Sequence, residues 1–295
     1  MKNYISEFLE YLKNEKGYSE YTIKSYYEDI RFFYEFLKEK NIKKVDYPEI
    51  RFYLSHLYDK KYKSKTIARH ISSLRSYFRY LIREEYIKTN PMKLITNPKI
   101  EKKLPQYLNH NELDTLLTAP DKNTPLGLRN ALILELLYST GIRVSELVNI
   151  KLSDIDLSSK RILILGKGNK ERIALFGNRC SELITRYLNE SRSILLKKET
   201  DYLIINKNGT PLTDRGVRFI IDNIVKESAL KLNISPHTIR HTFATHLLNE
   251  GADLKTVQDL LGHESIAATG IYTHVSIEHL RKTYLDNHPR ARKEE

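Results

Sequence analysis

The chain has 295 residues and carries 49 lysines and arginines against 37 aspartates and glutamates, which gives a formal net charge of +12. Its hydrophobic fraction of 40% is enough to bury a core, so the composition excludes a disordered or fibrous protein. The positive charge favours nucleic acid as the partner, ahead of an anionic membrane surface. The single cysteine, Cys180, excludes a disulfide framework and fits a reducing cytoplasm. Neither a signal peptide nor a membrane-spanning apolar stretch is visible, so we expect a cytoplasmic protein.

Residues 1–97 are expected to form a helical domain. Apolar residues recur at helical spacing in four stretches, which begin near Tyr4, Ser19, Pro48 and Ser64. The same part of the chain holds 14 of the 20 tyrosines. A tyrosine can pack on one side and touch phosphate oxygens on the other, although packing between helices is the more ordinary explanation for any one of them.

The fourth of these stretches carries a basic face beside its apolar one. Lys65, Arg69, Arg75 and Arg79 lie along it, and acidic residues are absent until Glu84. A helix of this kind can lie between a hydrophobic core and a DNA backbone. We therefore predict that these four basic residues bind DNA, while a solvated face is the commoner role for surface lysine and arginine.

A linker over residues 98–106 is predicted to follow. It begins and ends near prolines and carries charge with little apolar content, which is typical of a boundary between domains. Residues 107–275 are then expected to form the second domain, and residues 276–295 a C-terminal helix and tail.

The second domain is expected to combine helices with a small β region. A strongly apolar helix from Leu128 to Thr140 should end at Gly141. Two β-rich stretches, 161–165 and 171–175, flank a glycine-containing turn and predict a β-hairpin. Residues 201–206 are expected to add a short strand, after which the chain becomes helical again.

Four short motifs carry residues suited to phosphate chemistry. Arg143 follows the glycine that ends the apolar helix, and Lys167 lies in the turn of the hairpin. His237 and Arg240 share one helix face at a spacing of three residues, which pairs a titratable group with a bidentate phosphate clamp. The fourth motif is LGH followed by IYTH near the C-terminus.

A metal site is not expected. His237 and His241 have the i,i+4 spacing that can hold a metal ion. However, no carboxylate or cysteine completes such a site at a familiar spacing. The chain therefore gives no reason to invoke a metal or another cofactor.

Taken in order, the motifs TGIRVSEL, GKGNKER, HTIRHTFATHLL, LGH and IYTHV resemble those of the tyrosine site-specific recombinases of the phage integrase type. Each motif alone is weak evidence, but the ordered set is highly specific. The stretches SKTIARHISSLRSYFRYLIREE, KKLPQYL and HPRA are similar to the Xer subgroup, so the resemblance covers nearly the whole chain. It implies a mainly α, two-domain protein with an N-terminal four-helix SAM-like core-binding domain. The C-terminal catalytic domain would be mixed α/β with a small antiparallel β-sheet.

The resemblance also implies a catalytic set for transesterification at a DNA phosphate. Two arginines and a histidine would hold the phosphate oxygens, and a tyrosine would attack the phosphorus to form a 3′-phosphotyrosine. A lysine would protonate the leaving 5′-oxygen, and a second histidine would accept the proton of the tyrosine. The resemblance assigns Arg143 and Arg240 as the two arginines, His263 as the first histidine and Tyr272 as the attacking tyrosine. Lys167 would be the lysine and His237 the second histidine, and Glu146 would support Arg143.

The implied partners are double-stranded DNA with a specific recombination site and further protomers. A homo- or heterotetramer on two duplexes would exchange strands through a Holliday junction, with residues 276–295 docking on a neighbouring protomer. We expect resolution of chromosome or plasmid dimers, with a septal DNA translocase as a further partner to consider. The alternatives left open are a phage or transposon integrase, a type IB topoisomerase, and a DNA-binding protein that has lost catalysis.

Overall fold

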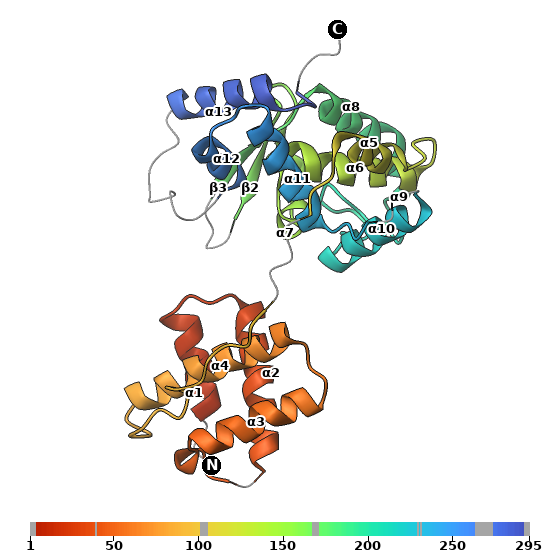
Figure 1. Cartoon of the computed structure of the whole chain (residues 1–295). Helices are drawn as coiled ribbons and strands as arrows, with labels where there is room; N and C mark the ends of the chain where they lie inside the picture. The colour runs from red at the N-terminus through yellow and green to blue at the C-terminus, as the bar shows by residue number, and fades with distance from the viewer. Residues whose placement is uncertain are drawn as a thin grey trace. The chain divides into compact units, whose positions relative to one another are not determined.

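The chain divides into two compact units, Met1–Lys103 and Leu104–Glu295, each with its own hydrophobic core (Figure 1). Both units are mainly helical, and the second also contains a small sheet, which confirms the predicted fold class. No helix in the part of the chain that the structure describes is long and apolar enough to cross a membrane. This computed structural model describes residues 4–38, 40–100, 106–166, 171–228, 230, 232–262 and 274–291.

Two helices of the first unit, those that begin at Glu20 and Tyr47, start where the sequence supplies caps. Ser19 accepts a hydrogen bond from the Thr22 amide at the start of its helix, and Asp46 forms a reciprocal capping box with Glu49. The tyrosines of this unit differ in burial, since Tyr53 is fully buried in the core whereas Tyr21 is 84% exposed. The elements are α1 (Tyr4–Asn14), α2 (Glu20–Leu37), η1 (Ile42–Lys44), α3 (Tyr47–Asp59) and α4 (Ser64–Arg83).

Helix α6 lies at the centre of the second unit. It is apolar on every side, as a helix must be when neighbours surround it, and it packs against α5, α8 and α11. Thr124 caps its start, and Gly141 ends it in the left-handed conformation at φ 59°, as predicted. The helical elements are α5 (His110–Thr118), α6 (Pro125–Thr140), α7 (Val144–Val148), η2 (Leu152–Asp154), α8 (Asn178–Arg186), η3 (Tyr187–Arg192), α9 (Ser193–Leu195), α10 (Asp214–Glu227), α11 (Pro236–Asn249), α12 (Leu254–Leu261) and α13 (His274–Asn287).

The sheet has three antiparallel strands in the order β1-β2-β3, namely β1 (Ile155–Asp156), β2 (Arg161–Leu165) and β3 (Glu171–Leu175). Leu165 pairs with Glu171 at the closed end of the β2–β3 hairpin, so the predicted hairpin is confirmed.

The strand predicted over residues 201–206 does not form. Only isolated bridges occur there, between Lys151 and Tyr202 and between Ile205 and Pro211. The reason lies in Arg192, whose Nη2 donates to the carbonyl oxygens of Thr200 at 2.6 Å and Tyr202 at 2.9 Å. A buried guanidinium thus satisfies carbonyls that a strand would direct at a neighbouring strand.

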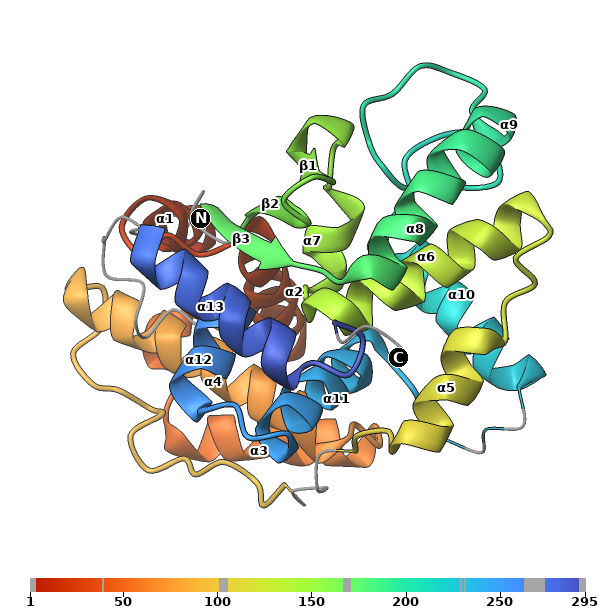
Figure 2. The same ribbon diagram turned by 90° about the horizontal axis from the view of Figure 1, so that it is seen from above.

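Helix α13 lies beside α12 (Figure 2). Its Tyr284, together with Ala291 further along the chain, belongs to the core of its own unit, and His288 between them is fully buried. These three residues therefore pack inside the second unit of the same chain.

Candidate active site

Arg143 lies where α6 gives way to α7, at the N-cap position of the shorter helix. Glu146, three residues later, faces back toward it. Its Oε2 accepts from the Arg143 amide at 2.8 Å, and its Oε1 accepts from Nη1 of the same residue at 2.9 Å. A short helix with an acidic third residue thus holds the arginine backbone and side chain together.

The Glu146 carboxylate is also held by Arg172 of β3, whose Nη2 donates to Oε2 at 2.7 Å. Burial raises the pKa of Glu146, but the Arg172 charge and the hydrogen bonds from Arg143 lower it more. The net pKa lies below its ordinary value. Glu146 is therefore an ionised acceptor at neutral pH.

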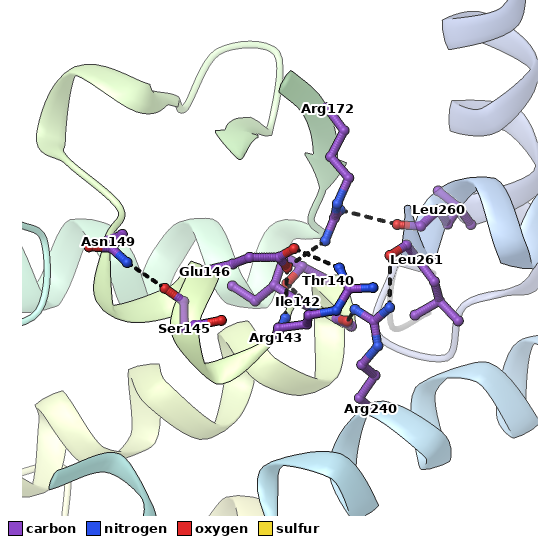
Figure 3. Close-up of polar contacts among 11 residues, drawn as sticks. Thr140, Ile142, Arg143, Ser145, Glu146, Asn149, Arg172, Arg240, Leu260 and Leu261 are labelled. Atoms are coloured by element: carbon purple, nitrogen blue, oxygen red, sulfur yellow. Dashed lines mark hydrogen bonds and ion pairs between the residues drawn. The ribbon is translucent and has the colours of Figure 1, made fainter. Parts of the chain in front are cut away.

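Arg240 approaches the same place from α11 (Figure 3). Ser235 caps this helix. The Arg240 Nη1 donates to the Gly141 carbonyl oxygen at 2.5 Å, and the Arg240 Nη2 donates to that of Leu261 at 2.8 Å. Burial, with the charges of Arg143 and Arg172, lowers the pKa of Arg240 to about 10, so the side chain stays protonated at neutral pH. The two arginines predicted to act together do lie close to one another (Figure 3).

The charge balance of this cluster favours an anion. The guanidinium groups of Arg143 and Arg172 pair with the single carboxylate of Glu146, and that of Arg240 lies nearby (Figure 3). The Arg143 side chain is 40% exposed and can reach a ligand, whereas that of Arg172 is only 7% exposed. An accessible guanidinium beside a second, partly buried one suits the oxygens of a phosphodiester.

His237 lies in the first turn of the helix that carries Arg240 and is exposed. The other predicted catalytic residues, Lys167, His263 and Tyr272, lie outside the described residues. Among the described residues, no group of three histidine, cysteine or acidic side chains could hold a metal ion.

Arg172 is the residue of this site that sequence reasoning missed. It pairs with Ile164 across the hairpin and shares the buried face with Ile162 and Ala174. A charged residue at an inward-facing position of an amphipathic strand was the available signal, because burial of a charge requires a partner.

The four basic residues predicted to bind DNA from α4 differ in exposure. Lys65, Arg69 and Arg79 are exposed, and Arg69 pairs with the buried Asp29 at 2.9 Å. Arg75 is partly buried, and its Nη2 donates to the Ile95 carbonyl at 2.7 Å. Arg75 thus holds the segment after α4, while the side chains of the other three remain exposed, that of Arg69 in an ion pair with Asp29.

Comparison with known proteins gives matches over both units. Family models match residues 106–279 as the phage integrase family and residues 5–85 as the phage integrase N-terminal SAM-like domain. The chain is 51% identical over 290 residues to the tyrosine recombinase XerC of Anoxybacillus flavithermus, across 96% of this chain and 97% of that one. It is 47% identical over 299 residues to the XerC of Bacillus licheniformis, across 99% and 98% of the two chains. A solved structure of the XerH site-specific recombinase bound to palindromic difH substrate, a post-cleavage complex, aligns with a TM-score of 0.71. Its sequence identity is 27%, over 95% of this chain and 84% of that one.

Proposed function

The chain is a tyrosine recombinase of the phage integrase family, as predicted, and we propose that it cuts and rejoins DNA at a specific site through a 3′-phosphotyrosine. The observation that carries this proposal is that Arg143 and Arg240 lie close together, with Arg143 held by the ionised Glu146 carboxylate and Arg240 held by the Gly141 and Leu261 carbonyls. These two arginines come from different elements and together form a positively charged cluster, in which the Arg143 side chain is 40% exposed.

Transesterification at a phosphodiester concentrates negative charge on the two non-bridging oxygens. Arg143 and Arg240 stabilise that charge, and His263 adds a hydrogen bond at the same centre. The Tyr272 hydroxyl attacks the phosphorus, so that a bond to its oxygen forms while the bond to the 5′-oxygen breaks.

Proton transfers complete the step. Lys167 delivers a proton to the leaving 5′-oxygen, and His237 accepts the proton of the Tyr272 hydroxyl. A tyrosine has an ordinary pKa near 10, so attack at neutral pH depends on this acceptor or on the nearby cations. The phosphotyrosine bond conserves the energy of the broken link, so rejoining requires neither a metal nor a nucleotide.

The biological role follows the XerC relatives. Four protomers on two duplexes exchange strands through a Holliday junction and resolve chromosome or plasmid dimers in the cytoplasm, with a septal DNA translocase as a candidate activator. Residues 1–97 bind DNA through Lys65, Arg69 and Arg79, and residues 98–106 link them to the catalytic residues 107–275. The tail of residues 276–295 docks on a neighbouring protomer through the exposed side of α13.

The test is trapping of the covalent intermediate on a nicked substrate that loses a short fragment after cleavage. The wild-type protein is expected to form an adduct that survives denaturation, and Tyr272→Phe is expected to form none while still binding the DNA. Tyr202→Phe, which changes a partly buried tyrosine in the same unit, is the matched control and should form the adduct. Undiminished adduct with Tyr272→Phe would remove Tyr272 as the nucleophile. Relaxation of supercoiled DNA without a specific site would indicate a topoisomerase instead.

A further inference from the structure

Arg172 connects three elements of the active site. Its backbone belongs to β3, the strand that follows Lys167 in the sequence. Its Nη2 donates to Glu146 of α7 at 2.7 Å, and its Nη1 donates to the Leu260 carbonyl of α12 at 3.2 Å. The neighbouring carbonyl, that of Leu261, accepts from Arg240. One buried guanidinium therefore ties the hairpin to the helix that carries Arg143 and to the helix end that Arg240 also holds (Figure 3).

The Arg172 side chain also lies directly against Gly262. A Cβ added to Gly262 would come within 2.5 Å of the Arg172 Cδ and 2.6 Å of its Nε. Gly262 ends α12 with φ 66°, a conformation that itself favours glycine. This close approach fixes where the chain leaves α12, immediately before His263.

Arg172 is unsuited to touch the substrate itself. Its side chain is 7% exposed, and two of its nitrogens already donate to Glu146 and to the Leu260 carbonyl. Its charge instead offsets that of Glu146. A carboxylate held by Arg172 leaves the exposed part of the Arg143 guanidinium available to an incoming phosphate.

We propose that Arg172 is a positioning residue for strand cleavage, which holds Glu146 against Arg143 and sets the end of α12 ahead of His263. This inference rests on the proposed function of the arginine cluster. Arg172 acts on the rate through other residues, so its loss slows cleavage without weakening the hold of the protein on DNA.

The test compares Arg172→Met with Arg172→Lys in single-turnover formation of the covalent adduct at saturating protein. The methionine variant is expected to be slower by about 10- to 100-fold, the usual effect of losing a group that orients a catalytic residue. Its affinity for the same DNA should be unchanged. The lysine variant should recover part of the rate, because an ammonium restores the charge but cannot serve both Glu146 and the Leu260 carbonyl.

Arg129→Met is the matched control. Arg129 is buried in the same unit and donates to the Ile205 carbonyl at 3.2 Å, away from the cluster. Its loss should destabilise the fold without slowing cleavage by the folded protein. A rate for Arg172→Met equal to that of the wild type, or an equal slowing by Arg129→Met, would overturn the proposal.

A double-mutant cycle tests whether Arg172 acts through Glu146. The double variant of Glu146→Gln and Arg172→Met should cleave no more slowly than the slower single variant, because both changes remove the same arrangement. If the rate loss of the double variant equals the product of the two single-variant losses, Arg172 acts independently of Glu146, and the positioning role is refuted.

Hydrogen exchange gives a readout that does not need activity. The Arg143 amide donates to Glu146, so Arg172→Met should speed exchange of that amide while Arg129→Met leaves it unchanged. Unchanged exchange in Arg172→Met would contradict the proposal even if cleavage slows. If the wild-type protein forms no adduct, the proposed function fails, and this measurement still decides the role of Arg172.

Discussion

Titratable side chains buried away from the arginine cluster make the stability of the second unit depend on pH. His288 is fully buried among aromatic rings, with centroids 4.8 Å from Tyr284, 5.0 Å from Tyr138 and 5.3 Å from Phe243. Burial is the main cause that lowers its pKa, to about 3 against an ordinary 6.5. The ring is therefore neutral in the folded protein throughout the mildly acidic range.

This arrangement predicts that acidification destabilises the wild-type protein through His288. A histidine with a lowered folded-state pKa contributes stability that is complete above pH 6.5 and is lost as the pH falls toward 3. Between pH 7 and pH 5 the loss from this group is about 2 kcal/mol. His288→Phe keeps an aromatic ring at the site, so its free energy of unfolding should fall less over the same interval.

Urea denaturation followed by circular dichroism at each pH measures the difference. Burial raises the pKa of Glu135, so acidification stabilises the fold through this residue. The effect is present in both proteins and does not change the comparison. Parallel stability curves for the wild-type protein and His288→Phe would contradict the assignment.

At the scale of elements, local signals predicted the parts whose cause is local. The apolar run before Gly141 predicted α6, and the paired β-rich stretches predicted β2 and β3. No element was predicted over residues 178–195, although apolar residues recur there at helical spacing, at positions 180, 183, 184, 187 and 188, so a local signal for α8 was present. The meeting of distant parts of the chain has no local signal, so the pairing of Arg143 with Arg240 came from the family resemblance and Arg172 was missed.

Gly141 illustrates how a helix end supports the active site. It has φ 59°, its carbonyl accepts from Arg240, and a Cβ there would come within 2.5 Å of Phe243 Cδ1. Gly141→Ala should therefore lower the free energy of unfolding by about 2–4 kcal/mol, which combines the cost of the left-handed conformation with that of overpacking.

Gly17→Ala is the matched control for that prediction. Gly17 has φ 61° but nothing within 4 Å of an added Cβ, so only the conformational cost of about 1–2 kcal/mol applies. Denaturation of both variants measures the two costs, and equal losses would show that contact with Phe243 contributes nothing.

At the scale of the whole molecule, the two cores share no residue. One cluster draws on residues from Phe8 to Ile95 and the other on residues from Leu108 to Ala291. Each unit therefore has the means to fold as a cooperative domain.

Core truncations should then act on one unit at a time. Phe33→Ala and Leu132→Ala each remove a fully buried side chain, one from each cluster, at a cost of about 2–5 kcal/mol. Each variant should speed hydrogen exchange in peptides of its own unit and leave those of the other unchanged. Faster exchange throughout both units in either variant would indicate a single cooperative structure.

The burial of Tyr284, His288 and Ala291 within the second unit has a consequence for biosynthesis. A domain emerging from the ribosome can close its interior only when every side chain that fills it has been translated. The helices from α5 to α12 leave the ribosome with a gap that these late residues must occupy. A nascent chain can thus complete the core of its second unit only after residue 291 has been translated.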